Sequence, residues 1–258
     1  MKMTKFGISI AIYFLCFTIT RPAYAQKEPD FNEIVAKFIE KSEADSLYIG
    51  DNYIHRERLI TKTLKNGVIS EIKEERFWVE KKNGELYKKL TEKDGLTVTN
   101  SRFKKKDEII SIGVELLERY DFVFARNENL EGTRCWVFNF RPKASPTYGR
   151  PREKLSELND KDGAFNRMAG EIWISQNGLS FKKIAGHLLS EASISKIIGS
   201  ARLFKLNFVA TAKLIEGRFA VDYIWAEYIY TAKLFGFVTV ISNRHEIREI
   251  FYEDYESR

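Results

Sequence analysis

The sequence predicts a mainly β protein with a few helices (α+β), in which a strongly curved antiparallel sheet wraps around the helices and leaves an apolar cavity. Apolar and polar residues alternate with a period of two over most of the chain, and turn dipeptides separate the alternating runs. One helical stripe of apolar residues stands near the start. Aromatic residues make up 14% of the chain, and such residues suit pleated, half-buried surfaces.

The composition of the 258 residues excludes several classes of protein. An apolar share of 44% is large enough to bury a core, which excludes a wholly disordered chain. Five prolines and two cysteines exclude collagen-like and disulfide-framework chains. The formal net charge of +6 falls to +3 when residues 1–25 and their three basic residues are removed, so no nucleic-acid partner is expected.

Residues 1–25 have the pattern of a cleavable signal peptide. Lys2 and Lys5 precede the apolar run 6–20, and Ala25 closes a small-x-small pattern that signal peptidase recognises. An uncleaved anchor is the alternative, but the run is shorter than the about 20 residues that span a bilayer. We therefore expect cleavage after Ala25 and an exported, unanchored single domain over residues 26–258.

The first element expected in the mature chain is an amphipathic helix. Asp30 can cap it, and Glu33 completes a capping box. Its apolar residues fall at helical spacing and form one stripe: Phe31, Ile34, Val35, Phe38 and Ile39. We expect this helix to end near Ser42. A second helical piece is expected between residues 109 and 120.

The remaining elements are expected to be strands, about a dozen in number. Turn dipeptides lie between the runs at Asn66-Gly67, Asn83-Gly84, Asp94-Gly95, Glu131-Gly132, Asn177-Gly178 and Glu216-Gly217. Because such pairs favour tight hairpins, consecutive strands should pair antiparallel. The expected strands are 47–60, 68–80, 85–91, 96–103, 122–126, 134–140, 169–175, 179–188, 194–206, 208–215, 218–230 and 237–251. The polar, proline-bearing stretch 141–162 is expected to be a loop.

Large aromatic residues on the strands are the candidates for lining a cavity. Trp136, Phe138 and Phe140 alternate onto one face of their strand, and Phe208 and Trp225 offer similar bulk further along the chain. These five residues are the predicted ligand-binding set. Ordinary core packing is the alternative for each of them.

No catalytic or metal-binding signature is found. The chain has no G-x-S-x-G elbow, P-loop or dinucleotide fingerprint. Its three histidines do not stand at metal-ligand spacing, and His245 and Glu249 share a strand face without a second histidine nearby. Cys135 is the single cysteine of the mature chain and is expected on a buried strand position. The sequence therefore predicts no enzyme activity, no cofactor and no metal.

Several strings along the mature chain resemble the LolA/LolB-like lipoprotein-carrier superfamily, which includes proteins labelled outer membrane lipoprotein-sorting. They lie at 53–58, 76–79, 84–90, 130–143 (LEGTRCWVFNFRPK) and 169–175 (AGEIWIS). The resemblance implies an unclosed β-barrel of about eleven strands, whose helices cover a hydrophobic cavity for acyl chains. It also implies a periplasmic location. The implied partners are lipid or lipoprotein acyl chains and, as candidates, inner- and outer-membrane transport components.

Three function classes follow from these observations. The first is an exported periplasmic protein that binds acyl chains in lipoprotein sorting or envelope lipid transport. The second is an envelope-sensing or protein-interaction module on the same scaffold, because a fold does not determine a function. The third is an outer-membrane barrel, which would need apolar lipid-facing bands that the charged strands at 71–76 and 85–93 do not offer.

Overall fold

The computed structural model describes residues 30–82, 85–105, 115–143, 164, 166–196, 199–234 and 237–254. From Phe31 onward these residues belong to one compact unit. The expected signal peptide, the turn at 83–84 and most of the expected loop at 141–162 lie outside the described residues. Among the helices that are described, none has the length and apolar character needed to cross a membrane.

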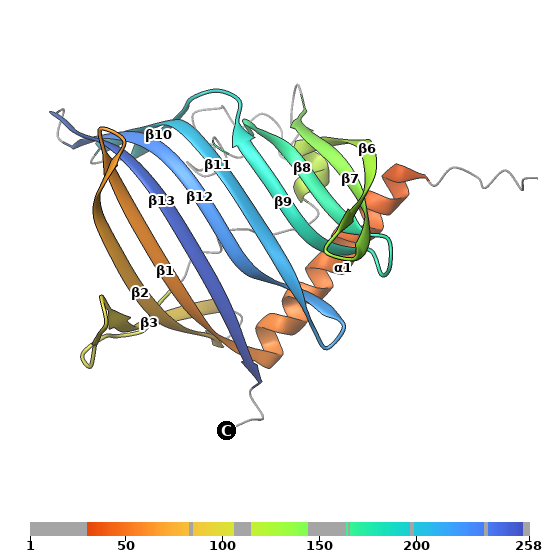
Figure 1. Ribbon diagram of the computed structural model, residues 1–258, viewed down its shortest axis with the longest axis horizontal. Helices are drawn as coiled ribbons and strands as arrows, with labels where there is room; N and C mark the ends of the chain where they lie inside the picture. The colour runs from red at the N-terminus through yellow and green to blue at the C-terminus, as the bar shows by residue number, and fades with distance from the viewer. Residues whose placement is uncertain are drawn as a thin grey trace, which may run out of the picture. The chain divides into compact units, whose positions relative to one another are not determined.

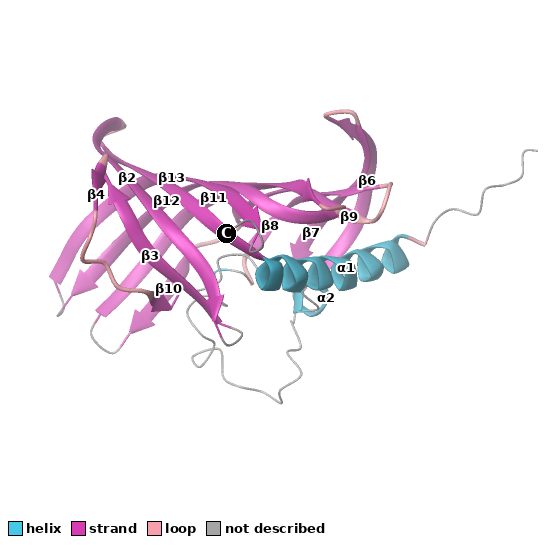
Figure 2. Cartoon of the chain, turned by 90° about the horizontal axis from the view of Figure 1, so that it is seen from below, coloured by secondary structure: helices cyan, strands magenta, loops and turns pink. Residues whose placement is uncertain are grey.

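One long antiparallel sheet forms most of the unit (Figures 1 and 2). Within the described residues it has 13 strands, in the order β4-β3-β2-β1-β13-β12-β11-β9-β8-β7-β6, with β10 beside β11 and β5 beside β3. β4 and β6 stand at the two ends of this order, and their described residues do not pair with each other, so the sheet is not closed, as the family resemblance implies. The strands are β1 Tyr53–Lys65, β2 Val68–Lys82, β3 Glu85–Lys93, β4 Leu96–Thr97, β5 Lys104–Lys105, β6 Tyr120–Leu130, β7 Thr133–Pro142, β8 Met168–Ser175, β9 Ser180–Leu188, β10 Ala192–Lys196, β11 Gly199–Ile215, β12 Arg218–Leu234 and β13 Phe237–Asp254.

The helix α1, Phe31–Asn52, lies across one face of the sheet (Figure 2). It contacts β1, β2, β6, β9 and β12, which lie far apart in the strand order. The helix thus crosses most of the strand order, and Figure 2 shows that the sheet curves around it. We call the face that carries α1 the inner face and the opposite one the outer face.

The expected end of α1 near Ser42 is wrong, and so is the expected strand start at residue 47. The helix continues for a further ten residues, because Asp45 and Ile49 extend its buried stripe at spacings of seven and eleven from Phe38. The first strand therefore begins at Tyr53. The short helix α2, Glu115–Arg119, falls inside the expected second helix.

Two other strand predictions need correction. The expected strand 96–103 is reduced to the two-residue strand β4, and the two-residue strand β5 follows just beyond its expected end. The expected break between strands 194–206 and 208–215 does not occur, because β11 runs through Asn207 without interruption. Asn207 Nδ2 donates to Glu227 Oε2 at 3.1 Å, so this polar residue sits on the outer face within the ladder. The strand boundary lies earlier, between β10 and β11.

The hairpin turns follow the expected dipeptides. Asn66 and Gly67 have φ angles of 53° and 79°, the left-handed values that two-residue hairpin turns require. The same pair of positive angles occurs at Asp94-Gly95, Glu131-Gly132 and Glu216-Gly217. At the remaining described turn the pair is Gly178 and Leu179, one residue later than expected.

Candidate functional site

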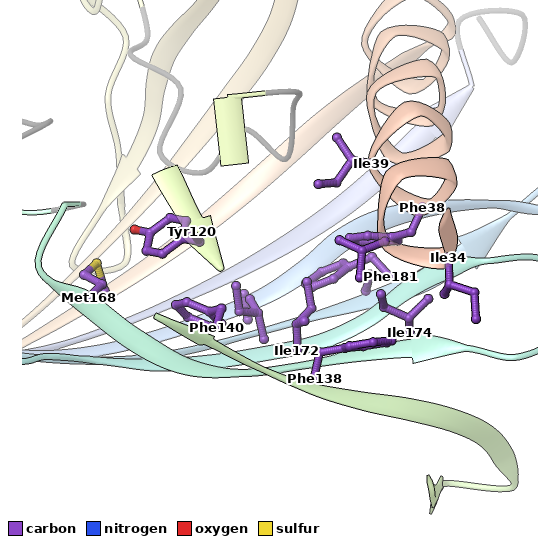
Figure 3. Packing of buried hydrophobic residues seen from close by; sticks show 14 residues of the cluster. Ile34, Phe38, Ile39, Tyr120, Phe138, Phe140, Met168, Ile172, Ile174 and Phe181 are labelled. Atoms are coloured by element: carbon purple, nitrogen blue, oxygen red, sulfur yellow. The ribbon is translucent and has the colours of Figure 1, made fainter. Parts of the chain in front are cut away.

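The inner face of the sheet is apolar from β6 to β12, and the first half of α1 covers it (Figure 3). Register places Phe138 opposite Ile172, Ile172 opposite Ile184, and Ile184 opposite Ala210. These side chains pack in one cluster with the helix residues Ile34, Val35, Phe38 and Ile39. Phe31 stacks on Phe124 with ring centroids 4.2 Å apart. The N-terminal half of α1 is thus anchored by several fully buried apolar side chains.

The C-terminal half of α1 covers a cavity instead of a filled core. The cavity has a volume of about 160 Å³ and lies between α1 and strands β1, β9, β12 and β13. In this half, Ile49 is the buried apolar residue of the helix. The apolar part of the wall includes Ile49, Leu86 of β3, Phe181, Phe219, Ala220, Val221, Ile224 and Ile250. The polar part includes Asp45, His55, Glu57 and Arg248.

Asp45 connects the C-terminal half of α1 to the sheet. Its carboxylate is 3% exposed and accepts hydrogen bonds from Lys41 Nζ at 2.8 Å and Arg218 Nη1 at 3.4 Å. It also accepts the backbone N–H of Phe219 at 3.3 Å. Because Arg218 and Phe219 belong to β12, this one side chain fastens the helix beside the cavity to a cavity-lining strand.

A buried ionic group forms the far wall of the cavity. Glu57 is 1% exposed and accepts a hydrogen bond from Arg248 Nη1 at 2.8 Å, and His55 Nε2 lies 3.1 Å from its other oxygen. A buried carboxylate needs such partners, since an unpaired one would be costly. Tyr252 lies beside His55 and donates to the carbonyl of Val221 at 2.8 Å. Burial raises the pKa of Tyr252 above its usual range, so it stays a neutral donor.

The structure brings three of the five sequence-predicted residues to one pocket, since Phe140, Phe208 and Trp225 line a hollow beside Gly170 and Gly186, but it does not gather all five on one face. Trp136, Phe138, Phe140 and Phe208 lie on the inner face, where Phe138 and Phe140 are buried and the other two are partly buried. Trp225 does not share this face, because it pairs with Val209 whereas Phe208 pairs with Ala226. Its ring instead lies on the outer face, 6.3 Å from that of His245.

The four inner-face residues also lie away from the cavity beneath the C-terminal half of α1. Phe138 is fully buried and makes edge contacts with Phe31 and Phe124, with centroids 5.8 and 5.9 Å apart. Phe140 and Phe208 lie over Gly186, where an added Cβ would come within 2.4 Å of Phe208 Cε1 and 3.2 Å of Phe140 Cζ. The glycine thus makes the space that these two rings occupy.

The predicted ligand-binding set contains none of the residues that line this cavity, and three of the missed residues are the charged side chains Asp45, Glu57 and Arg248. Asp45 interrupts the apolar stripe of α1 between Phe38 and Ile49, and this interruption was a usable signal for a buried polar contact. No comparable signal marks Glu57 or Arg248, because their meeting depends on the β1–β13 register.

The histidine and the cysteine that the sequence analysis considered for metal and thiol chemistry, His245 and Cys135, lie on the outer face, away from the cavity. His245 is on the outer face, with Nε2 3.7 Å from Glu227 Oε1. Among the described residues, no group of three or more metal-ligating side chains comes together. Cys135 is buried on the outer-face side of β7 beside Val137 and Trp173, and burial raises the pKa of its thiol.

Comparison with known proteins gives likenesses of fold. No protein-family model and no curated protein matches the chain. A LolA superfamily protein from Nitrosomonas europaea is 12% identical with a TM-score of 0.37, over 84% of this chain and 91% of that one. A putative outer membrane lipoprotein-sorting protein domain from Vibrio parahaemolyticus is 10% identical with a TM-score of 0.38, over 85% and 93%.

A third similar structure is MucB in complex with MucA(peri), 8% identical with a TM-score of 0.27, over 84% of this chain and 94% of that one. The first two structures carry the family names that the sequence strings resemble. All three TM-scores are below 0.5, and all three identities are below 25%.

Proposed function

We propose that this chain is an exported protein that binds the acyl chain of a lipid or lipoprotein against its inner face, beneath α1. The observation that supports the proposal is the cavity below the C-terminal half of the helix. Its wall combines apolar side chains with a few fixed polar groups, which is the usual composition of a small-molecule site. Each methylene group buried there would contribute about 0.8 kcal/mol.

The cavity must enlarge to hold a whole acyl chain, because its volume of about 160 Å³ is below the roughly 300–1,000 Å³ of ligand pockets. The uneven burial of α1 favours a movement of the helix as the way in which the cavity enlarges. The buried side chains of the N-terminal half of α1 are Ile34, Val35, Phe38 and Ile39, whereas those of the C-terminal half are Asp45 and Ile49. We propose that the C-terminal half lifts while the N-terminal half stays in place.

The apolar cluster next to the cavity would receive the rest of the chain. Phe181 and Ile224 border both the cavity and that cluster. From there the inner face continues toward Phe208, Phe140, Phe138 and Trp136. In this proposal these four residues line the end of the enlarged cavity, which an acyl chain reaches after the helix has moved.

The rest of the proposal concerns location and chemistry. The signal-peptide pattern of residues 1–25 supports export to the periplasm, with cleavage after Ala25. Binding and release of an acyl chain need no covalent step, so the proposed protein is a carrier without cofactor or enzyme activity. Membrane transport components are the partners proposed for loading and unloading it.

A matched pair of variants on β12 tests the proposal. Ile224 lines the cavity, whereas Ile229 pairs with Lys205 on the outer face. Ile224→Trp should fill the cavity and weaken the binding of a fluorescent fatty acid to mature protein, and Ile229→Trp should leave binding unchanged. The lipid that copurifies with the wild type should be detected by mass spectrometry. A wild type that carries no lipid and binds no probe contradicts the proposal.

A protein-interaction module is the second candidate function, and one observation favours it. β6 ends the strand order, and none of the described strands pairs with its outer edge. Such an edge can accept a strand from another protein. If the wild type binds no acyl probe but retains a protein partner, this second function replaces the first.

A further inference from the structure

The tip of the β1–β2 hairpin exposes a group of large apolar side chains. We call residues 62–73 the hairpin tip. Val68 is 70% exposed, Ile69 49% and Ile72 57%, and all three lie within five residues of one another. Single exposed apolar residues are ordinary, but a contiguous group of them can mark an interaction surface.

Neighbouring strands reach the same end of the sheet (Figure 1). Leu64 of β1 pairs with Asn243 of β13, and β13 extends from there back to Phe237. Phe237 pairs with Leu234 of β12, which pairs in turn with Gly199 of β11. The backbone register therefore brings the ends of β11, β12 and β13 to the side of the sheet where the hairpin tip lies.

The hairpin tip is also positively charged. It contains Lys62, Lys65 and Lys73 and one acidic residue, Glu71, whose carboxylate lies 3.0 Å from Lys73 Nζ. At the opposite end of the strands, Asp51, Glu216 and Asp254 line a common pocket with one cation, Lys81, which pairs with Asp51. That pocket has more acidic than basic side chains, whereas the hairpin tip is cationic and apolar.

We propose that the hairpin tip docks onto a bilayer surface that contains anionic lipids. Lysine side chains are attracted to anionic headgroups, and exposed aliphatic side chains enter the boundary between headgroups and acyl chains. The combination of both on one protruding tip fits a lipid surface, since a docking site for a neutral protein surface would not need the lysines. The long strand β12 connects this end to the cavity, because it carries Phe219, Val221 and Ile224 near its start and ends at Leu234.

If the chain carries acyl chains as proposed above, the docked hairpin tip is the place where it exchanges them with a bilayer. Only this exchange role rests on the proposed function. Docking itself follows from the exposed residues and their charge. It can therefore be tested whether or not the cavity binds acyl chains.

Vesicle sedimentation of the mature protein tests the docking. The double variant Val68→Ser/Ile69→Ser removes two exposed side chains, so its folding should be unchanged. We expect the wild type to sediment with phosphatidylcholine vesicles that contain phosphatidylglycerol, more strongly at low salt than at high salt. The double variant should bind these vesicles about tenfold more weakly.

Two control variants make this result specific. Val123→Ser/Leu214→Ser removes equally exposed apolar side chains, 63% and 57%, from strands β6 and β11 outside the hairpin tip, and it should bind vesicles like the wild type. Lys62→Gln/Lys65→Gln should lose the preference for anionic vesicles.

Three outcomes would overturn the docking. In the first, the wild type fails to sediment with anionic vesicles. In the second, Val68→Ser/Ile69→Ser binds vesicles like the wild type. In the third, size-exclusion chromatography shows that this variant separates a wild-type oligomer into monomers, which would make the hairpin tip an interface between copies of the chain. Binding of the fatty-acid probe is measured in parallel, so loss of docking with intact probe binding leaves the cavity proposal standing.

Discussion

Replacing Asp45 with asparagine should make the protein less stable and at the same time a better acyl binder. The side chain keeps its shape, so its oxygen can still accept the backbone N–H of Phe219. It loses its charge, which weakens the bonds from Lys41 at 2.8 Å and Arg218 at 3.4 Å. Bonds to charged groups contribute about 1.5–3 kcal/mol. Because both cations are about one third exposed, solvent screening lowers this, and we expect a loss of about 2 kcal/mol.

The weakened Arg218 bond should favour ligand binding, because lifting the C-terminal half of α1 away from β12 breaks that bond in any case, whereas the Lys41 bond lies within α1 and moves with the helix. Each 1.4 kcal/mol removed from the cost of opening tightens apparent binding by up to about tenfold. Chemical denaturation measures the free energy of unfolding, and titration with a fluorescent fatty acid measures affinity. Asp51→Asn is the matched control on the same helix, since Asp51 is exposed and pairs with Lys81, and it should change either quantity little. If Asp45→Asn loses stability and binds the probe no more tightly than the wild type, the lifting of α1 is refuted.

Four further predictions concern the core. Phe138→Ala should lower the free energy of unfolding by about 3–5 kcal/mol in a denaturant titration, because its ring is fully buried; a loss below about 1 kcal/mol would show that the ring is not part of the core. Gly186→Ala should destabilise by about 1–3 kcal/mol, since its Cβ would meet Phe208 at 2.4 Å, and an unchanged melting temperature would contradict this contact. The Cys135 thiol, whose pKa burial raises, should react with a thiol reagent after unfolding but not before, and rapid labelling of the native protein would disprove its burial. Burial raises the pKa of Tyr120 to about 12, above the value of about 10 in the unfolded chain. The neutral phenol should therefore contribute its full stability below pH 10 and lose it between pH 10 and 12. A free energy of unfolding that stays constant over that range would contradict this prediction.

Local signals in the sequence predict most of the sheet. Strand alternation and turn dipeptides depend on neighbouring residues, so the hairpins at Asn66-Gly67 and Glu216-Gly217 could be placed before the structure was known. The extension of α1 could not be placed in this way. Residues 43–52 form a helix because Asp45 bonds to β12, a contact 174 residues away in sequence at Phe219.

The candidate site depends on contacts that alternation cannot predict. Alternation within one strand correctly placed Trp136, Phe138 and Phe140 on one face. Whether Phe208 and Trp225 share a face depends on the register between β11 and β12, which alternation within each strand does not give. The observed register, with Val209 opposite Trp225, puts them on opposite faces. The cavity itself follows from how α1 crosses the sheet, because its apolar anchors are concentrated in its first half.

The central claim is that the inner face beneath α1 holds an acyl chain. Native mass spectrometry of the purified mature protein, followed by lipid extraction, tests it most directly. The account predicts a bound species with the mass of an acyl lipid, which a fluorescent fatty acid displaces and which Ile224→Trp protein carries in reduced amount. A wild-type protein that is free of lipid and takes up no fatty acid would contradict it.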